Sequence, residues 1–318
     1  MQKIDLSIIL VNYNTEHLLH DVIKKTRLAL SQIAAEIIIV DNASKDSSVE
    51  VILRDYPECH LISNQTNIGF GRANNLALDH IQGRYVLLLN TDAFVSQDSL
   101  YKTIQYMADH PEAGILGVKL VGRDGILQPS CRYFPRPWNL FLQRSGLTRF
   151  FPKTQMIDDM DWGHAMEKDC DWVPGCFYLV RREVIDEVGL FDPRYFLYYE
   201  EVDHCLAAKN AGWEVHYFPD TSVIHLGGES AKSEGALTNS GSQLEVLQIE
   251  SELLYFRKNH GLYGLGIHVL LCTLSDCINL LKGILKRKPI NQWSQNIQHS
   301  VLVWKLFIRT RAGLYSTR

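Results

Sequence analysis

The N-terminal part of the chain alternates strand-like apolar runs with helix-like amphipathic segments. This order is typical of βαβ units in a parallel sheet with right-handed crossovers. Because ligands of such sheets bind at the carboxyl ends of the strands, the sequence predicts a site at that edge. Strand-like runs occur at 6–11, 37–40, 61–62 and 85–89, with helix-like segments at 16–31, 47–56 and 72–81 between them.

Polar side chains follow these apolar runs at the points where the strands should end. The first run leads into Asn12 and Asn14, the second into Asp41, and the last into Asn90-Thr91-Asp92. A carboxylate at a rigid, dry strand end suits a divalent cation beneath a diphosphate. Taken alone, such a triplet is more often a turn or helix cap, because Asn and Asp side chains bond their own backbone. The prediction that Asp92 binds a metal therefore depends on other segments meeting it.

Length and composition exclude several classes of protein. With 318 residues, the chain can form one large α/β domain plus an extension. Its seven cysteines are odd in number and lack CxxC spacing, which favours reduced thiols in the cytosol. No signal peptide is expected, because the N-terminus leads almost directly into a strand. The missing glycine-rich fingerprints disfavour a dinucleotide dehydrogenase and a P-loop ATPase.

The second half of the chain predicts further strands and helices with one irregular segment. Residues 131–171 are rich in aromatics and proline without a sustained period, so they form either a surface excursion or an acceptor-side flap. Residues 227–232 have the composition of a flexible lid. Strands are expected at 114–121, 126–130, 177–182, 215–218 and 222–225, and helices at 96–109, 200–211 and 242–258.

The C-terminal region is basic although the whole chain is acidic. From Lys282 onward there are eight Lys or Arg and no Asp or Glu. Because the net charge of the whole chain is −4, the residues before Lys282 carry a net charge of about −12. Aromatic side chains between these charges favour an anionic membrane surface over nucleic acid. The apolar segment 262–285 contains Asp276, which disfavours a single transmembrane helix. An interfacial or hairpin membrane dock, a dimerisation helix and a core-packing helix remain open.

Seven short motifs occur in order along most of the chain, and together they resemble family 2 of inverting, sugar-nucleotide-dependent glycosyltransferases, specifically its bacterial rhamnosyltransferase-like members. The motifs are Val11-Asn-Tyr-Asn14, Val40-Asp-Asn42 with Ser44, Asn67-Ile-Gly-Phe-Gly71 with Asn74, Leu89-Asn-Thr-Asp92, Pro174-Gly-Cys176, Phe191-Asp192 with Tyr199-Glu-Glu-Val-Asp203 and Gly212-Trp213, and His225-Leu-Gly-Gly-Glu-Ser230.

The resemblance implies an α/β fold of the GT-A type, a Rossmann-like nucleotide-diphospho-sugar transferase. Its mostly parallel central sheet would be flanked by helices and followed by a C-terminal helical extension. Residues 1–260 would form the catalytic domain, with a nucleotide-binding half at about 1–92 and an acceptor-binding half at about 93–260. Residues 261–318 would form the basic, apolar extension that associates with membrane.

The resemblance also assigns roles by position. Asp92 would be the direct ligand of Mg²⁺ or Mn²⁺ and His225 a second one. The nucleotide and donor would contact Val11, Asn12, Asn14, Asp41, Asn42, Ser44, Asn67, Gly69, Asn74, Asn90, Thr91 and Asp92. The acceptor would contact Trp172, Gly175, Cys176, Asp203 and Lys232.

An inverting transfer needs one carboxylate to accept the proton of the attacking hydroxyl. The resemblance gives this role to Glu201, with Glu200 orienting it or binding the acceptor. Family members usually carry Glu-Asp here, so Glu201 is one methylene longer than the usual base. Asp203 is more simply explained as a helix-start carboxylate stabilised by the helix dipole.

The implied activity is transfer of one sugar from a nucleotide-diphosphate sugar to a glycan or lipid-linked saccharide acceptor. By resemblance, dTDP-rhamnose is the first donor to consider and a UDP-sugar the next. The expected location is the cytoplasm, peripheral at the cytoplasmic face of the inner membrane, with a homodimer possible and no nucleic acid bound. A processive polysaccharide synthase is disfavoured by the missing Gln-x-x-Arg-Trp motif, and a catalytically silent scaffold remains the third reading.

Overall fold

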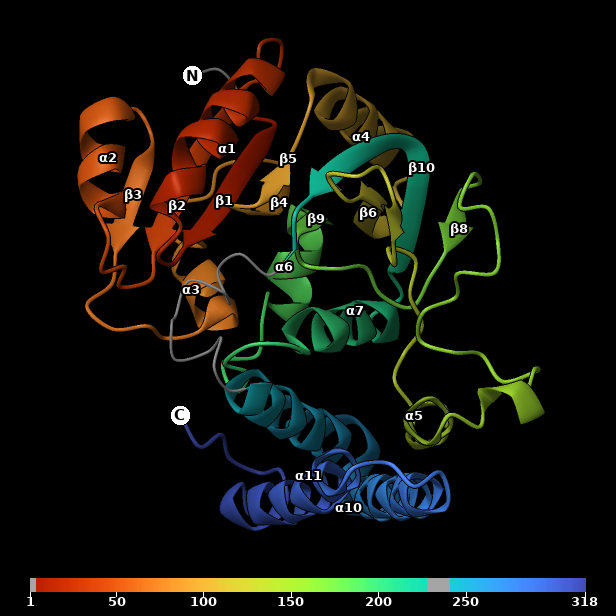
Figure 1. Ribbon diagram of the computed structural model, residues 1–318. Coiled ribbons are helices and arrows are strands. Elements are labelled where there is room, and N and C mark those ends of the chain that lie inside the picture. Colours follow the sequence, from red (N-terminus) through yellow and green to blue (C-terminus); the bar gives the residue numbers. More distant parts are fainter. Residues whose placement is uncertain (1–3, 228–240) are drawn as a thin grey trace. The chain divides into compact units, whose positions relative to one another are not determined.

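The computed structural model describes residues 4–227 and 241–318, which divide into two compact units (Figure 1). The sheet unit comprises Met1–Arg132, Met160–Pro193 and Glu200–Gly241, and the helical unit comprises Tyr133–Asp159, Arg194–Tyr199 and Ser242–Arg318. The boundary between the two units thus lies near residue 242, and the segments Tyr133–Asp159 and Arg194–Tyr199 also belong to the helical unit. The functional boundary predicted near residue 260 stays a prediction.

The N-terminal half of the sheet has the predicted parallel order. Strand β1 pairs in parallel with β2 on one side and β4 on the other, and β2 pairs in parallel with β3. The side chains of the central strands are buried on both faces, as near-continuous apolar runs require. The four strands are β1 (Leu6–Asn12), β2 (Ala35–Asp41), β3 (His60–Ser63) and β4 (Tyr85–Asn90).

The second half of the sheet mixes parallel and antiparallel neighbours. The order is β3-β2-β1-β4-β9-β6-β10-β5, in which β9 runs antiparallel to both β4 and β6, and β10 runs parallel to β6. The short strands β7 and β8 pair with β6 and β10. These strands are β5 (Ala93–Phe94), β6 (Ala113–Val121), β7 (Leu127–Gln128), β8 (Lys168–Asp169), β9 (Phe177–Arg181) and β10 (Glu214–His225).

One prediction about the strands is wrong in detail. The runs at 215–218 and 222–225 were expected as two strands, but they form the single strand β10. The ladder to β6 shifts register between Phe218 and Ser222. Pro219 lies in this gap and has no backbone N–H to give to the ladder, so the strand bulges and then resumes pairing. The second half of β10 consequently reaches the same sheet edge as β4.

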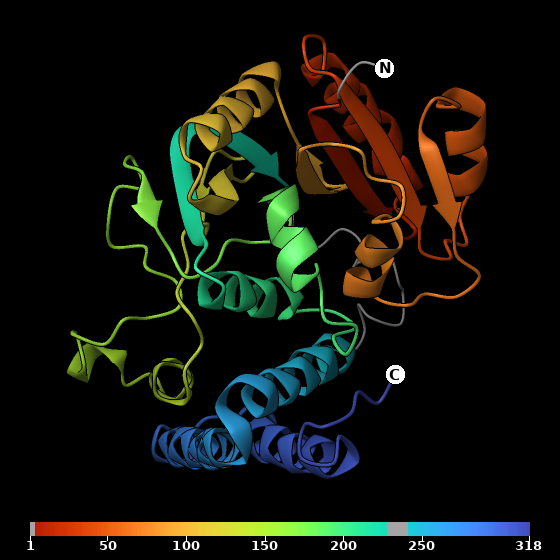
Figure 2. The ribbon, with the colours of Figure 1, turned by 180° about the vertical axis from the view of Figure 1, so that it is seen from behind.

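Helices cover the sheet on both sides (Figures 1 and 2). Side chains of α1, α2 and α4 share one core with Leu6, Ile8 and Leu10 of β1, while α3, α6 and α7 lie on the other side. Helix α3 ends at Leu76 and not at the predicted residue 81. Near this end the side chains of Asn74 and Asn75 donate hydrogen bonds to the backbone carbonyls of Phe70 and Phe191. The helices are α1 (Glu16–Ala29), α2 (Ser48–Asp55), α3 (Phe70–Leu76), α4 (Gln97–Asp109), α6 (Arg182–Val188) and α7 (Glu200–Asn210).

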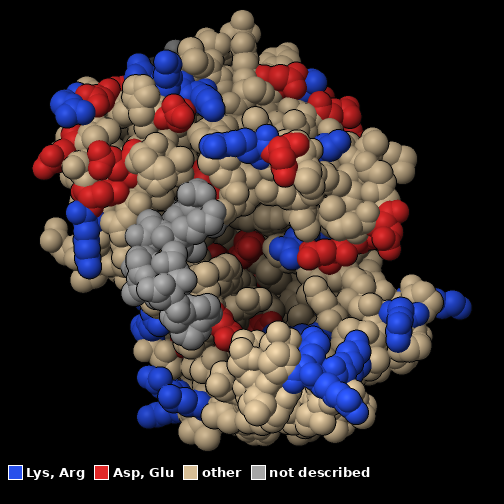
Figure 3. All heavy atoms as spheres, viewed as in Figure 1, with Lys and Arg blue, Asp and Glu red and all other residues tan. Residues whose placement is uncertain are grey.

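The helical unit contains α5 (Pro137–Ser145), the 3₁₀ turn η1 (Thr148–Phe150), α10 (Gly241–Leu285) and α11 (Ile290–Arg309). The predicted helix at 242–258 and the apolar segment after it are two parts of α10, separated where Gly261 adopts φ 66°. Glycine tolerates this left-handed conformation without steric cost. Figure 3 shows Lys and Arg side chains gathered over the helices of this unit.

By length and composition alone, Gln243–Leu285 could cross a membrane, a test that a buried core helix also passes. Asp276 lies on this helix and is only 8% exposed. Its Oδ2 accepts hydrogen bonds from His299 (2.7 Å) and Ser300 (2.6 Å) of α11. Asp276, which interrupts the apolar pattern, therefore has its hydrogen bonds satisfied between α10 and α11.

Candidate active site

The ends of β1 and β2 bring three of the predicted nucleotide-side residues together. Asn12 stands opposite Asp41 in the parallel register. Its Nδ2 donates to Asp41 Oδ1 (2.8 Å) and to Ser44 Oγ (3.0 Å). Thr15 donates to Asn12 Oδ1 (2.6 Å) and to the hydroxyl of Thr91 (3.0 Å). The tips of β1, β2 and β4 are thus joined by one buried hydrogen-bond network.

The turns after these strands present backbone groups at the same edge. Asn14 and Ala43 have φ values of 52° and 68°, in the left-handed region that tight turns require. The amide of Asn14 donates to Ser44 Oγ (2.9 Å), and the amide of Ser44 donates to Asp41 Oδ2 (3.0 Å). A carboxylate has further lone pairs, so Asp41 can accept another hydrogen bond. Its recognition of a nucleobase stays a prediction.

Asn42 organises the loop that carries the predicted diphosphate contacts. Its Nδ2 donates to Asn67 Oδ1 (2.8 Å), and its Oδ1 accepts from the amide of Ile68 (3.1 Å). Gly69 has φ 89°, a conformation that favours glycine, and its amide donates to Asn67 Oδ1 (2.9 Å). Asn74 is buried, and its Oδ1 accepts no hydrogen bond from the described residues.

The two predicted metal ligands are neighbours. Asp92 follows β4 and is 3% exposed, and its carbonyl accepts the amide of Leu226 (3.0 Å). His225 ends β10 and pairs with Ala93 of β5. The distance between His225 Nε2 and Asp92 Oδ1 is 3.5 Å. Strands that are far apart in sequence therefore deliver a carboxylate and an imidazole to one place.

Gln128 was missed by sequence reasoning, and it sets the chemistry of His225. Gln128 Nε2 donates to the carbonyl of His225 (2.9 Å), and its Oε1 lies 2.8 Å from His225 Nδ1. Because Oε1 can only accept, Nδ1 carries the proton and Nε2 keeps its lone pair toward Asp92. Burial lowers the pKa of His225 and the charge of Asp92 opposes this shift. An oxygen and a neutral imidazole nitrogen fit Mg²⁺ or Mn²⁺.

Cys176 lies in a turn beside the end of β4. Its carbonyl accepts the amide of Asn90 (3.1 Å), which places the Gly175-Cys176 turn beside the end of β4. Burial raises the pKa of the Cys176 thiol, and the charges of Asp92 and Glu201 raise it further. The thiol is therefore neutral and lies within electrostatic reach of both carboxylates. The sequence ranked this turn as an acceptor contact, which stays a prediction.

The Glu200–Glu201 pair begins α7, where Glu200 is buried and Glu201 is half-buried. Glu200 is 3% exposed, and the Oε2 atoms of both residues are buried without a hydrogen-bond partner among the described residues. Burial raises the pKa of Glu200 well above its ordinary value, and the charge of Glu201 adds to the effect. Burial also raises the pKa of Glu201, while the Arg132 guanidinium opposes the rise. A charge on Glu201 therefore disfavours a second charge on Glu200.

Arg132 is a second residue that the sequence did not reveal. Its guanidinium lies 4.0 Å from the ring centre of Trp172, and the two backbones form a bridge. Trp172 is only 5% exposed, and its contact with the acceptor stays a prediction. Asp203 is buried in the first turn of α7. Lys232 and the segment 228–240 lie outside the described residues.

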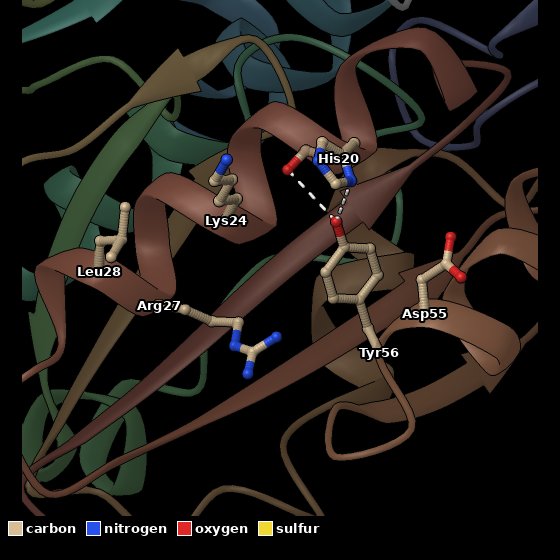
Figure 4. A pocket seen from close by; sticks show the side chains of 6 residues that line it. All are labelled: His20, Lys24, Arg27, Leu28, Asp55 and Tyr56. Carbon is tan, nitrogen blue, oxygen red and sulfur yellow. Dashed lines mark hydrogen bonds between the residues drawn. The ribbon is translucent and has the colours of Figure 1, made fainter.

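A separate hollow of about 510 Å³ lies between α1 and the end of α2 (Figure 4). Several of its lining side chains already have partners. The Tyr56 hydroxyl bonds His20 Nδ1 (2.7 Å), and Arg27 pairs with Glu58 (3.0 Å). No residue predicted for the active site lines it.

Comparisons with known proteins bear on the first half of the chain and on the fold. A family model described as Glycosyl transferase family 2 matches residues 7–172. N-acetylglucosaminyl-diphospho-decaprenol L-rhamnosyltransferase of Mycobacterium tuberculosis (strain H37Rv) is 28% identical over 206 residues, which cover 59% of this chain and 66% of that relative. The chain thus spans slightly less than two thirds of the mycobacterial relative.

Two further relatives have rhamnosyl transfer in their names. Rhamnosyltransferase WbbL of Escherichia coli K12 is 30% identical over 203 residues, covering 60% of this chain and 72% of the relative. The dTDP-rhamnosyl transferase RfbF of Shigella flexneri is 24% identical over 260 residues, covering 79% of this chain and 80% of the relative.

Solved structures at lower identity share the fold. The mannosyltransferase PcManGT from Pyrobaculum calidifontis, in complex with GDP-Man and Mn²⁺, has a TM-score of 0.55 at 14% identity, covering 100% of this chain and 89% of that one. Residues 1–349 of S. aureus TarS in complex with UDP give 0.52 at 13% identity, covering 98% and 92%. At these identities the similarity shows the GT-A fold alone.

Proposed function

Because the chain belongs to glycosyl transferase family 2, whose model matches more than half of it, we propose that it moves one sugar from a nucleotide-diphosphate sugar to a hydroxyl group with inversion at the anomeric carbon. The observation that carries the proposal is the Asp92–His225 pair, which β4 and β10 bring together from distant parts of the chain. An inverting transfer needs a place for the leaving diphosphate and, across the anomeric carbon from it, a carboxylate that accepts the proton of the attacking hydroxyl.

The reaction proposed for this site is a single displacement. Glu201 accepts the proton of the acceptor hydroxyl as its oxygen attacks the anomeric carbon, and the nucleoside diphosphate leaves from the opposite side. Glu200 stays protonated beside it, because burial and the charge of Glu201 both disfavour its ionisation. No residue forms a covalent bond to the sugar, in contrast to retaining glycosidases with paired carboxylates.

Asp92 and His225 are the residues that would hold Mg²⁺ or Mn²⁺. The fixed tautomer of His225 and the buried carboxylate of Asp92 supply the nitrogen and oxygen ligands that such an ion takes. When bound, the ion neutralises charge that grows on the departing diphosphate.

The relatives named for rhamnosyl transfer make dTDP-rhamnose the first donor to test, with UDP-sugars next. For the acceptor we propose a hydroxyl of a lipid-linked or cell-surface glycan, in line with the decaprenol-linked substrate in the name of the mycobacterial relative.

A donor screen tests this function directly. Purified protein is incubated with dTDP-rhamnose, UDP-sugars or GDP-sugars, with a lipid-linked acceptor, and with Mg²⁺, Mn²⁺ or a chelator. We expect one donor to release nucleotide in an acceptor- and metal-dependent manner and to raise the melting temperature, because a ligand that binds only the folded state stabilises it. Release of nucleotide from no donor in the panel would contradict the proposal, and a product ladder on a gel would instead indicate a processive synthase.

For the C-terminal region we propose a peripheral contact with an anionic membrane surface. Apolar side chains on α10 and α11 are exposed at helical spacing, and the basic residues Lys286, Arg287 and Lys288 follow directly after α10 in the sequence. Basic residues beside an exposed apolar face favour a negatively charged lipid surface. The exposed apolar residues include Leu270, Leu274, Leu281 and Leu285 on α10, and Ile297, Val301, Trp304 and Ile308 on α11.

We expect Lys286→Gln/Arg287→Gln/Lys288→Gln to weaken binding to phosphatidylglycerol vesicles about a hundredfold, because each basic residue near such a surface contributes about 1 kcal/mol. Co-sedimentation at low and high salt measures this. The matched control is Lys24→Gln/Lys25→Gln/Arg27→Gln on α1, which should bind like the wild type. Equal binding by both triple variants would contradict the proposal, and a concentration-dependent dimer without vesicle binding would assign the apolar face to a second copy.

A further inference from the structure

A network of buried charges lies within the helical unit and contains none of the residues assigned to the reaction. At its centre is Glu252 of α10, which is 1% exposed. Arg144 Nη2 donates to Glu252 Oε1 (3.0 Å) and Oε2 (2.9 Å), and His268 Nε2 lies 3.2 Å from Oε2. The hydroxyl of Tyr199 donates to Oε1 (3.0 Å). Every oxygen of this buried carboxylate is thus hydrogen-bonded, as burial of a charge requires.

The network continues from Arg144 to the last long helix. Arg144 Nη1 donates to His299 Nε2 (2.9 Å), and the other ring nitrogen of His299 donates to Asp276 (2.7 Å). The chain of hydrogen bonds therefore joins α5, both parts of α10 and α11. Burial alone would raise the pKa of Glu252, but the charge of Arg144 and the hydrogen bonds of His268 and Tyr199 hold it at about 2.

Glu252, His268 and Cys272 are close enough together to ligate a cation, but their surroundings argue against one. The Arg144 guanidinium occupies both oxygens of Glu252 and would repel a metal ion. Burial raises the pKa of Cys272 to about 12, so the thiol does not supply the thiolate that metals prefer. The group is an ion-pair network whose partners are already in place.

The network holds a short segment of the helical unit, Arg194–Tyr199. Besides the bond from Tyr199 to Glu252, Ser251 Oγ donates to the carbonyl of Leu197 (2.8 Å). The ring of Tyr199 packs against Tyr255 at a centroid distance of 5.3 Å. Two neighbouring residues of α10, Ser251 and Glu252, therefore fasten this segment through its backbone and through a side chain.

The backbone of this segment is held in an unusual conformation. Tyr198 and Tyr199 have φ values of 71° and 68°. Two consecutive bulky residues in the left-handed region are unfavourable, and such strain persists only where the surroundings determine it. Strained backbone of this kind concentrates at functional sites. The next residue along the chain is Glu200, the first of the two carboxylates proposed for the reaction.

We propose that Glu252 and Arg144 are positioning residues, which fix Tyr199 and through its peptide bond set the start of α7 and the orientation of Glu200 and Glu201. This inference rests on the proposed function for the role of the two carboxylates. Neither Glu252 nor Arg144 touches the substrate. Their effect is to keep Tyr198 and Tyr199 in the left-handed conformation that precedes α7, the helix on which the two acids lie.

The test is Tyr199→Phe, which removes one hydroxyl and keeps the ring that packs on Tyr255. We expect kcat to fall about tenfold while the KM for the donor stays within about twofold, because a misplaced base slows the chemical step and leaves donor binding intact. Tyr56→Phe is the matched control, since it removes a hydrogen-bonded tyrosine hydroxyl from His20 in the sheet unit. A second pair compares Glu252→Gln with Glu250→Gln, because Glu250 holds Ser316 and Thr317 instead.

Hydrogen exchange gives a readout that does not depend on turnover. In Tyr199→Phe and Glu252→Gln, we expect amides of residues 196–203 to exchange faster than in the wild type, while those of 85–92 stay unchanged. Unchanged exchange at 196–203, or an equal fall of kcat in Tyr56→Phe, overturns the inference. If the wild type turned over no donor, the proposed function would fail, and the exchange result would still decide whether the network holds the segment.

Discussion

Asp92→Asn should lower metal-dependent turnover about a thousandfold while leaving the protein folded, because a metal ion contributes several kcal/mol to stabilising a departing diphosphate. Asparagine has the shape of aspartate and keeps one of its oxygens, so the change removes the charge with little change in volume. The backbone bond from Leu226 to the carbonyl of residue 92 does not involve the side chain and should survive.

The effect should be large because, among the described residues, this site has few other acids for the cation. The usual first acid of the family's Asp-x-Asp motif is Asn90 in this chain. The ion then depends on Asp92, on His225 and on oxygens of the donor itself. A neutral amide 3.5 Å from a neutral imidazole leaves no negative charge on the protein side of that pair.

The matched control is Asp169→Asn. Asp169 of β8 also forms an Asp–His pair with β10, since its Oδ1 lies 3.0 Å from His216 Nε2. Neither residue of this pair is among the predicted site residues. The measurement is nucleotide release against Mg²⁺ and Mn²⁺ concentration for both variants and the wild type. Near-normal metal-dependent turnover in Asp92→Asn would refute the assignment, and an Asp92→Ala protein that still complements a deletion strain would indicate a scaffold.

The nucleotide side of the site could be predicted because it is built from local patterns. Each apolar run has the length of a strand and stops on Asn or Asp, and parallel pairing then forces these ends to one edge. Asn12 and Asp41 meet for this reason alone. Their contact needs only the order of the elements along the chain.

The rest of the site depends on pairings that no local pattern encodes. Strand β9 runs antiparallel between β4 and β6, and it is this insertion that brings Cys176 beside Asn90. Gln128 lies in a short predicted strand and Arg132 in the segment without a sustained period, and neither pattern indicates that they contact His225 and Trp172. The buried tether of Tyr199 likewise depends on a glutamate more than fifty residues away. Such contacts follow from tertiary packing.

Glu201→Gln should lower kcat about a thousandfold with little change in the KM for the donor, since a positioned base contributes about a hundredfold to ten-thousandfold. Glutamine keeps the length of the side chain and cannot accept a proton at neutral pH. Donor-side residues such as Asn12 and Asp41 lie at the ends of β1 and β2, away from helix α7 in the sequence, and their hydrogen bonds should be unchanged. Thermal-shift binding of the donor should therefore be unchanged in this variant.

The pH dependence follows from the sign of the two shifts. Burial raises the pKa of Glu201, so the base is protonated, and turnover is lost, as pH falls through a value above that of an ordinary glutamate. For stability the sign is opposite to that of a salt-bridged acid. The native state keeps protons that the unfolded chain releases, so the pair's contribution to stability declines as pH rises from the ordinary value to the raised one. A pH profile of kcat and of the melting temperature measures both effects.

Glu200→Gln is the control that separates the two acids. Burial and the charge of Glu201 both raise the pKa of Glu200. Glu200 is therefore neutral in the wild type when Glu201 is ionised and acts as the base. Its replacement by neutral glutamine should leave kcat within about tenfold of the wild type and keep the acidic limb that Glu201→Gln abolishes. It should also raise the melting temperature at high pH and not at low pH. If Glu200→Gln, and not Glu201→Gln, removed the acidic limb, the base would be Glu200 and the roles of the two residues would be reversed.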